Sequence, residues 1–188
     1  MIYIMRHGKT DWNVDYKLQG QTDIPLNEDG IKMAREAGIR YKDVHFDVCY
    51  SSPLIRAVRT AELVLECREE KIPIITDDRL KEMSFGICEG VDHVYRKPDS
   101  PVYPLFKDPE NYKGVEGGET FDEIFARTGN FMKEVAIPLS QQGKDVLIVG
   151  HGAMNTSIIV GMKNIPLKNF WDVGIENCKL INIDEFTL

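Results

Sequence analysis

The sequence predicts an α/β fold in which a mainly parallel sheet forms the middle of a three-layer α/β/α sandwich. Short apolar runs alternate with segments of helical periodicity, the pattern of strand–helix units that build a parallel sheet. Two of these runs end in a histidine–glycine step, at Ile2 to Gly8 and at Val146 to Gly152. The 188 residues, 43% hydrophobic and 28% charged, are typical of one domain with an adequate core. We therefore expect a single domain over residues 1–188.

Five apolar runs are expected to form the strands, and capping signals mark the helices between them. The expected strands lie near residues 1–6, 45–51, 73–76, 145–150 and 179–184. Asn27 is placed to cap a helix that runs to about Gly38. Ser52-Pro53 predicts the start of another helix, because a capping residue is followed by proline at the first helical position. The apolar stripe of that helix consists of Ala57, Ala61, Val64 and Leu65.

Two further helices are expected in the second half of the chain. Thr120 to Glu123 forms a capping box that opens the first of them. The second follows Gly152 and ends before Pro166. The residues of the first helix that are expected to face the core are Phe121, Ile124, Phe125, Thr128, Met132 and Val135.

The segment between Asp92 and Gly118 interrupts the alternation of strands and helices. Its density of prolines excludes a regular helix or a central strand, and a loop this long in a compact domain is usually functional or disordered. Interleaved aromatic residues favour an ordered flap, and an insertion that serves packing alone is the alternative. The prolines are Pro98, Pro101, Pro104 and Pro109, and the aromatic residues are Tyr95, Tyr103, Phe106 and Tyr112.

Charge and cysteine usage argue against several classes of protein. The net charge of −7 disfavours a nucleic-acid partner and an anionic membrane surface. No apolar stretch approaches the roughly 20 residues that span a bilayer, and the first residues predict a strand rather than a signal peptide. The four cysteines lack metal-binding spacing, and Cys49 and Cys178 lie in or beside apolar runs. Buried thiols in a reducing, cytoplasmic setting are therefore expected.

The two histidine–glycine steps place imidazoles at one edge of the predicted sheet. Open α/β sheets bind ligands at the carboxyl ends of their strands, so His7 and His151 are expected to converge there, with Arg6 beside the first. A neutral imidazole can attack phosphorus, while guanidinium groups hold phosphate oxygens. Arg56 lies in the first turn of the helix expected after residue 53, near the same edge, but taken by itself it is interpreted as a surface arginine of that helix. Two unrelated histidines at strand ends are the alternative.

Several motifs, in the same order along nearly the whole chain, resemble those of the histidine phosphatase superfamily, the clan of phosphoglycerate mutase. The tripeptide Arg-His-Gly alone is weak evidence, but the ordered set is specific. The resemblance implies a phosphoglycerate mutase-like fold. The matching motifs are Arg6–Asn13, Leu18–Leu26, Ser51–Ala57 with Thr60-Ala61, Glu82 with Phe85-Gly86 and Glu89-Gly90, Gly117–Thr120, and Gly150–Gly152.

The resemblance also implies a role for each site residue. His7 is expected to be the nucleophile that forms a phosphohistidine. Glu82 is expected to be the general acid and base, because the leaving alkoxide needs a proton and the attacking water has to lose one. The phosphate ligands are expected to be Arg6, Arg56 and His151, with Asn13 as a further phosphate contact and Gln19 and Gly20 on the substrate side.

No metal ion and no cofactor are expected at this site. His7 and His151 lack the local partners of zinc-binding histidines, and the neighbouring arginines would repel a divalent cation. The expected partner is a small-molecule phosphomonoester, and the sequence leaves the oligomeric state open.

The expected activity is metal-independent hydrolysis of the phosphomonoester of a small metabolite. Mutase-type phosphoryl transfer is one alternative, and a catalytically inactive phosphate-binding module is another. Hydrolysis is favoured over transfer, because Phe85 stands where mutases have a tyrosine and the flap contains few cations. The presence of the whole expected catalytic set argues against the inactive module. The flap is expected to determine specificity through its aromatic residues and through Arg96, Lys97, Lys107 and Lys113.

Overall fold

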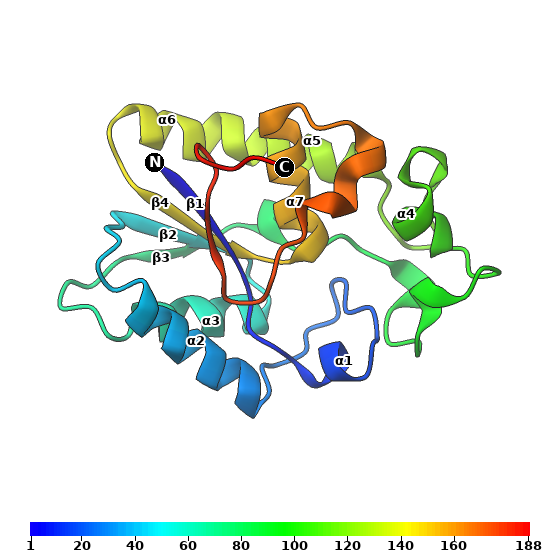
Figure 1. Cartoon of the computed structure of the whole chain (residues 1–188), viewed down its shortest axis with the longest axis horizontal. Helices are drawn as coiled ribbons and strands as arrows, with labels where there is room; N and C mark the ends of the chain where they lie inside the picture. The colour runs from blue at the N-terminus through cyan, green and yellow to red at the C-terminus, as the bar shows by residue number, and fades with distance from the viewer.

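The computed structural model describes residues 1–188 as a five-stranded sheet between two layers of helices (Figure 1). All five expected strands are present, in the order β3-β2-β4-β1-β5 across the sheet. Every pair except β1–β5 is parallel, which confirms the expected sandwich with a mainly parallel sheet. The strands are β1 (Ile2–Arg6), β2 (Val48–Ser51), β3 (Ile74–Thr76), β4 (Val146–Gly150) and β5 (Leu180–Asn182).

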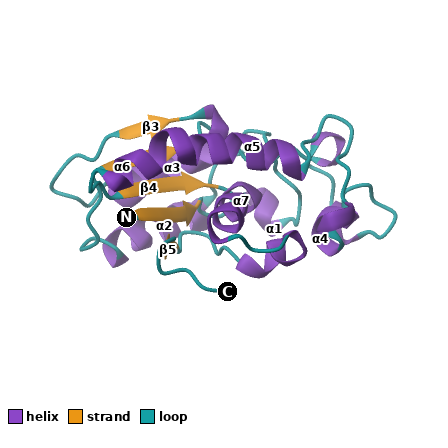
Figure 2. Cartoon of the chain, turned by 90° about the horizontal axis from the view of Figure 1, so that it is seen from above, coloured by secondary structure: helices purple, strands orange, loops and turns teal.

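The two central strands end level with each other. β1 and β4 run parallel, with Arg6 opposite Gly150. A hydrogen bond from the His7 N–H to the Gly150 carbonyl (2.9 Å) extends this pairing by one residue. His7 and His151 therefore leave the sheet at the same edge. Figure 2 shows that the strands point toward the side of the molecule where the short helix α4 (Tyr103–Lys107) lies.

Helices cover both faces of the sheet, because successive strand residues point to opposite faces. Tyr3 and Met5 of β1 pack with α2 and α3, whereas Ile2 and Ile4 pack with α5 and α7 (Figure 1). None of the helices combines the length and apolar character that a bilayer-crossing segment needs. Besides α4, the helices are α1 (Asp11–Val14), α2 (Glu28–Arg40), α3 (Ile55–Leu65), α5 (Phe121–Phe131), α6 (Ile137–Gln141) and α7 (Gly152–Lys163).

Side-chain caps mark the start of two long helices, as expected. Asn27 accepts the N–H of Gly30 (2.9 Å) at the start of α2. Thr120 and Glu123 form a reciprocal capping box at the start of α5. From α5 the chain continues through one π-helical turn, Met132–Ala136, into α6.

Helix α3 begins later than Ser52-Pro53 predicts. The Ser52 N–H still bonds to the Val149 carbonyl (3.0 Å), so this residue belongs to the edge of the sheet. The first N–H of the helix, at Ile55, bonds instead to the carboxylate of Asp23 (2.8 Å) in a distant loop. The prediction that Pro53 occupies the first helical position was therefore wrong, because a group from another segment caps the helix. The expected apolar stripe of α3 is buried.

The flap, residues 92–118, is ordered and lies beyond the ends of the strands (Figure 1). The expectation that its prolines exclude a regular helix was wrong for α4. Pro104 occupies the first turn of that helix, where its missing N–H sacrifices no hydrogen bond. Val102, Leu105 and Tyr112 of the flap are buried in the same core as α5 and α7, which anchors the segment.

Three of the four cysteines are buried and none forms a disulfide. The expected burial of Cys49 and Cys178 is confirmed. Burial raises the pKa of the Cys178 thiol to about 12, so this side chain stays protonated at neutral pH and acts as a small apolar group.

Candidate active site

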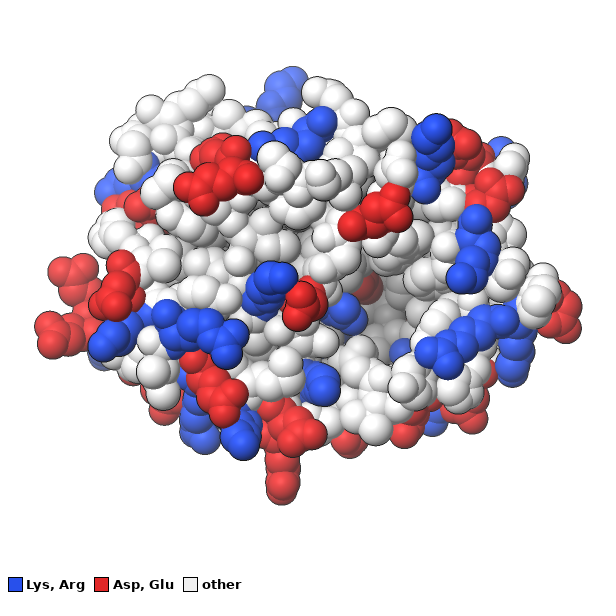
Figure 3. Space-filling model, viewed as in Figure 1, with Lys and Arg blue, Asp and Glu red and all other residues white.

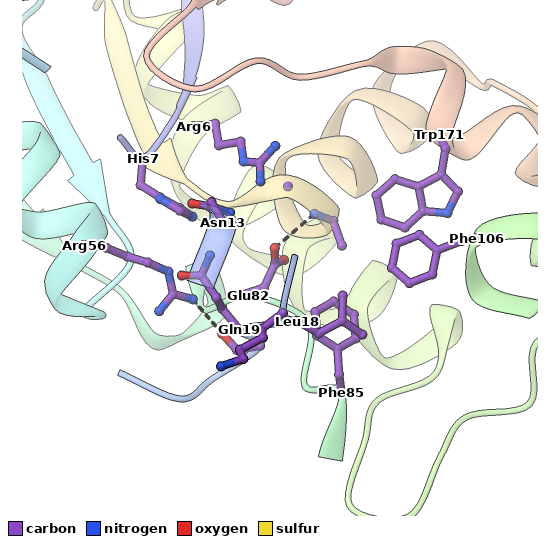
Figure 4. A pocket seen from close by; sticks show the side chains of 14 residues that line it. Arg6, His7, Asn13, Leu18, Gln19, Arg56, Glu82, Phe85, Phe106 and Trp171 are labelled. Atoms are coloured by element: carbon purple, nitrogen blue, oxygen red, sulfur yellow. Dashed lines mark hydrogen bonds between the residues drawn. The ribbon is translucent and has the colours of Figure 1, made fainter. Parts of the chain in front are cut away.

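A pocket of about 220 Å³ opens at the carboxyl ends of β1 and β4 (Figure 4). The rings of His7 and His151 meet beside it, with centroids 5.2 Å apart, which confirms their expected convergence. His151 is fully buried beside His7 and does not itself line the pocket. The other expected site residues all line it: Arg6, His7, Asn13, Gln19, Gly20, Arg56 and Glu82.

The main chain fixes the orientation of His7. Its Nδ1 lies 2.6 Å from the carbonyl oxygen of Gly8, which can only accept, so Nδ1 carries the proton. The lone pair of the neutral ring is then on Nε2. Burial, followed by the charges of Arg56 and Arg6, lowers the pKa of His7 well below its ordinary value. The ring is therefore neutral at neutral pH, the state that a nucleophilic imidazole requires.

The main chain around the nucleophile is itself held on both sides. Asn177 donates to the His7 carbonyl (2.6 Å), and the Gly8 N–H donates to the Thr60 hydroxyl (3.0 Å). A Cβ at Gly8 would lie 2.5 Å from the carbonyl oxygen of Gly30 in α2. Glycine is required after the histidine because the loop packs directly against that helix.

Two guanidinium groups that form no ion pair lie beside the histidines. Arg56 is fully buried and donates to the carbonyls of Gly20 (2.6 Å) and Thr22 (2.9 Å). Arg6 donates to the Ile175 carbonyl (3.1 Å), and the Nε of each arginine has no partner. Burial lowers the pKa of Arg56 to about 10, so the group remains charged at neutral pH. Two adjacent guanidinium groups with free N–H donors form a binding site for an anion.

His151 adds an unpaired ring to the same site. Neither of its ring nitrogens has a hydrogen-bond partner, and burial followed by the charge of Arg56 lowers its pKa well below the ordinary value. The side-chain oxygen of Gln19 is unpartnered as well. Buried polar atoms are nearly always hydrogen-bonded, so this concentration of unpartnered atoms indicates that a polar ligand completes the site. The donors among these atoms, the Nε–H groups of Arg6 and Arg56 and one ring N–H of His151, suit the oxygens of a phosphoryl group, whereas the Gln19 oxygen can only accept.

Glu82 approaches the histidines from the loop that follows β3. Its carboxylate accepts hydrogen bonds from the N–H groups of Met83 (2.9 Å), Ala153 (3.2 Å) and Met154 (2.9 Å). The last two belong to the first turn of α7, where the helix dipole favours negative charge. Only 8% of Glu82 is exposed, so its carboxyl group reaches solvent mainly through the pocket.

Asn13 and Gly20 contribute to the site in different ways. The Oδ1 of Asn13 accepts from the N–H (3.1 Å) and hydroxyl (3.2 Å) of Thr10, so Asn13 caps its own turn. Its Nδ2 donates to no group of the chain and is available to a ligand in the pocket. Gly20 supplies the carbonyl that holds Arg56, and its φ of +51° favours glycine. A Cβ at Gly20 would also overlap the carboxylate of Glu89.

The opposite end of the pocket is apolar. Phe106 and Trp171 stack there with ring centroids 4.8 Å apart, and the Trp171 indole N–H donates to a carbonyl of α4 (2.6 Å). Trp171 was not expected in the site, because no local pattern marks it; only the fold brings Leu167–Val173 to the pocket. We call this the aromatic end, formed by Leu18, Phe85, Phe106 and Trp171. The charged end is lined by Arg6, His7, Arg56 and Glu82 (Figure 4), with His151 buried beside His7.

Of the flap side chains, Phe106 alone lines the pocket. Tyr112 is buried in the core, and Arg96 lies over a tyrosine ring, with its Cζ 4.5 Å from the ring centroid. Lys17, from outside the flap, does line the pocket, but its ammonium group lies 3.4 Å from the Asp92 carboxylate. The flap thus supplies one aromatic side chain and no cation to the pocket lining.

One group of possible metal ligands lies away from the pocket. Ligand atoms of His45, Asp47 and Asp145 lie within 4.8 Å of one another, next to the amino ends of β2 and β4. Asp47 already pairs with Lys144 (3.0 Å), and Asp145 pairs with the amino group of Met1 (2.7 Å). These ion pairs account for both carboxylates.

The face of the molecule shown in Figure 3 is hollowed on the side of α4. Basic and acidic side chains are intermingled over the rest of this face. Such mixing differs from the continuous basic band typical of a nucleic-acid interface.

Comparison with known proteins identifies the family. The family model of the histidine phosphatase superfamily (branch 1) matches residues 2–186. The uncharacterized phosphatase PhoE of Bacillus subtilis (strain 168) is 40% identical over 186 residues, which cover 96% of this chain and 83% of that protein. The 2,3-bisphosphoglycerate-dependent phosphoglycerate mutase 2 of Gloeobacter violaceus is 28% identical over 180 residues, which cover 95% and 82%. The structure of the mycobacterial glucosyl-3-phosphoglycerate phosphatase Rv2419c with VO3 has a TM-score of 0.82 and 27% identity, covering 95% and 90%.

The parallel sheet, the paired histidines and the arginines at its carboxyl edge define an α/β enzyme of phosphoryl chemistry. The chain belongs to the histidine phosphatase superfamily. Within that family it is an enzyme that hydrolyses phosphomonoesters.

Proposed function

We propose that this enzyme acts through a phosphohistidine on His7, without a metal ion. The observation that carries the proposal is the bond from the His7 Nδ1–H to the Gly8 carbonyl (2.6 Å), which leaves the lone pair on Nε2. The unpaired guanidinium groups of Arg6 and Arg56 lie beside that ring and can neutralise the phosphoryl oxygens. Because these cations occupy the charged end, the charge that a divalent ion would supply there is already present.

The reaction proceeds in two transfers. In the first, Nε2 of His7 attacks phosphorus; the P–N bond forms, the P–O ester bond breaks, and protonated Glu82 gives its proton to the leaving oxygen. In the second, a water molecule attacks phosphorus, Glu82 takes a proton from it, and the P–N bond breaks to release phosphate. Glu82 is then protonated again and His7 is neutral. The phosphoryl oxygens stay on Arg6, Arg56 and His151 throughout.

The aromatic end supports a substrate whose leaving group is apolar or aromatic. Phe106 and Trp171 offer a stacked pair of rings against which such a group can lie. The one cation in the lining outside the charged end is Lys17, and Asp92 and Asp15 lie 3.4 Å and 3.5 Å from its ammonium group. A leaving group with a second negative charge therefore meets no free cation.

Mutase-type phosphoryl transfer is the second candidate, and similarity to a phosphoglycerate mutase favours it. A mutase has to hold substrates that are anionic at both ends. Phe85, Phe106 and Trp171 provide no partner for a second anionic group, which is why we place hydrolysis first.

Two measurements test the proposal. The enzyme should hydrolyse p-nitrophenyl phosphate in EDTA, and a rapid acid-free quench with ³²P-labelled substrate should trap an acid-labile label on the protein. His7→Ala should abolish both signals. Full activity of His7→Ala, or activity that EDTA removes, would overturn the mechanism. Efficient interconversion of phosphoglycerates, greater than release of phosphate from them, would favour the mutase.

The proposed setting is the cytoplasm, with a small-molecule phosphomonoester as the partner and neither nucleic acid nor membrane involved. The net charge of −7 and the mixed surface charge support this view. Fractionation of cells that express the tagged protein, with recovery in the soluble cytoplasmic fraction, is the expected result.

A further inference from the structure

We propose that Arg127 and Glu119 are positioning residues that hold Glu82 in place for proton transfer, an inference that rests on the proposed function of Glu82. Glu119 belongs to the Gly117–Thr120 motif, to which the mechanism above assigns no role. Neither side chain lines the pocket. Both act on the main chain on either side of Glu82.

Arg127, on α5, donates hydrogen bonds to the main chain of the segment that precedes Glu82, residues 79–82. Its Nη1 donates to the carbonyls of Arg79 (2.7 Å) and Lys81 (2.7 Å), and its Nη2 donates to the carbonyl of Glu82 itself (3.0 Å). The side chain is 18% exposed, so these bonds compete little with water. One guanidinium group thus fixes three carbonyls of a loop that has no strand or helix of its own at Glu82.

Glu119 holds the residues that follow. Its carboxylate accepts from Nε (2.7 Å) and Nη2 (2.9 Å) of Arg127, and also from the N–H of Ser84 (2.9 Å). The Glu119 N–H returns a bond to the Ser84 carbonyl (2.9 Å). Glu82 therefore lies between a stretch fixed by Arg127 and a stretch fixed by Glu119, and the two fixing groups form a bidentate pair.

The charges of the pair explain why this arrangement suits a proton-transfer residue. Arg127 contacts Glu82 only at its main-chain carbonyl, and its positive charge is matched by Glu119. The Glu82 carboxylate instead accepts hydrogen bonds from the N–H groups of Met83, Ala153 and Met154. The pair can therefore fix the position of the carboxyl group without forming an ion pair with a group that has to gain and lose a proton.

A purely structural role is distinguishable from a positioning role. If the pair only stabilised the loop, its loss would lower the melting temperature and would reduce turnover of every substrate alike. Arg79 provides the matched control, because it lies in the same segment and pairs with Asp77 (2.7 Å) and Glu134 (2.6 Å). Its side chain forms its hydrogen bonds and ion pairs with Asp77 and Glu134 and none with Glu82.

The experiment compares kcat for p-nitrophenyl phosphate, a good leaving group, with kcat for an alkyl phosphate, whose leaving group needs the proton most. Arg127→Met should lower kcat for the alkyl phosphate about 10- to 100-fold more than for the aryl phosphate, because small misplacements of a catalytic group cost this much. KM should change little. Arg79→Met should lower the melting temperature and leave the ratio of the two kcat values unchanged.

Two further variants separate failure of this inference from failure of the proposed function. Adding Arg127→Met to Glu82→Gln should cause no additional change in the kcat ratio, because no carboxyl group remains to be positioned. If Glu82→Gln alters the ratio and Arg127→Met does not, positioning is refuted and the acid role stands. If Glu82→Gln leaves the ratio unchanged, both are refuted. Should Arg127→Met fail to fold, Glu119→Gln has to show the same selective loss for the inference to survive.

Discussion

The charged and aromatic ends of the pocket are held by different forces. At the charged end, His7, Arg56 and Glu82 are each held by hydrogen bonds to main-chain groups; His7 directly follows β1, and Arg56 lies in the first turn of α3. At the aromatic end, Phe106 belongs to α4 of the flap and Trp171 to a 3₁₀ segment; their rings stack, and one hydrogen bond, from the Trp171 indole N–H to an α4 carbonyl (2.6 Å), adds to this apolar contact. Directional bonds place atoms narrowly, whereas apolar contact tolerates many shapes. The comparison predicts strict requirements for chemistry and permissive requirements for the leaving group.

The largest effect is expected from removal of a cation at the charged end. Arg56→Met should reduce kcat/KM by about 10³-fold, because it deletes a preorganised donor to the phosphoryl group and leaves two buried carbonyls unpaired. Steady-state kinetics with p-nitrophenyl phosphate measures the loss. Arg59→Met, on the same helix but exposed and paired with Glu62, is the control and should retain activity. An active Arg56→Met enzyme would mean that the charged end is not where phosphate binds.

The loop that holds Arg56 gives the second test. Gly20→Ala should lower kcat/KM about 10²-fold, because its Cβ would overlap the Glu89 carboxylate and displace the carbonyl that orients Arg56. Gly143→Ala is the matched control: its φ is +82°, and nothing lies within 4 Å of the added Cβ. Both variants should lose stability from the backbone conformation, but only the first should lose activity. Equal activities would show that this loop does not position the arginine.

Changes at the aromatic end should be smaller and selective. Trp171→Ala should raise KM for aryl phosphates about tenfold, the loss expected from one stacking contact of about 1.4 kcal/mol, and should leave small alkyl phosphates nearly unaffected. Trp171→Phe retains the ring and should retain most of the affinity. A uniform loss for all substrates would show that the aromatic end supports the fold and does not select the leaving group.

The buried histidines predict a modest dependence of stability on pH. The pKa values of folded His7 and His151 lie well below the ordinary 6.5, so the unfolded chain binds more protons below that pH. The contribution of each neutral ring to the free energy of unfolding is complete above about pH 6.5. It is lost as the pH falls toward the pKa of that histidine in the folded protein. Thermal unfolding between about pH 5 and 6.5 should show a shallower slope for His151→Gln than for wild type.

Much of the charged end was predictable because local patterns mark it. An apolar run followed by His7 or His151 indicates a strand with a histidine just after its carboxyl end. A parallel sheet brings the carboxyl ends of its strands together at one edge. The roles expected for Arg56 and Glu82 depended on resemblance to a family, since neither residue stands out in its own segment. Asn13 is compatible with both a structural and a ligand-binding role. Its amide oxygen caps a turn, while its amide nitrogen remains available to a ligand.

The sequence by itself determined the five strands, the two-sided helical layers and the convergence of the two histidines, because each is carried by the periodicity and capping of neighbouring residues. The tertiary structure alone decided the start of α3, the aromatic end and the support of Glu82. Asp23 caps α3 across 32 residues, Arg127 reaches Glu82 across 45, and Trp171 bonds to α4 across 66. Contacts between residues so far apart produce no periodic pattern in the sequence, because they depend on how the helices and strands pack against one another once formed.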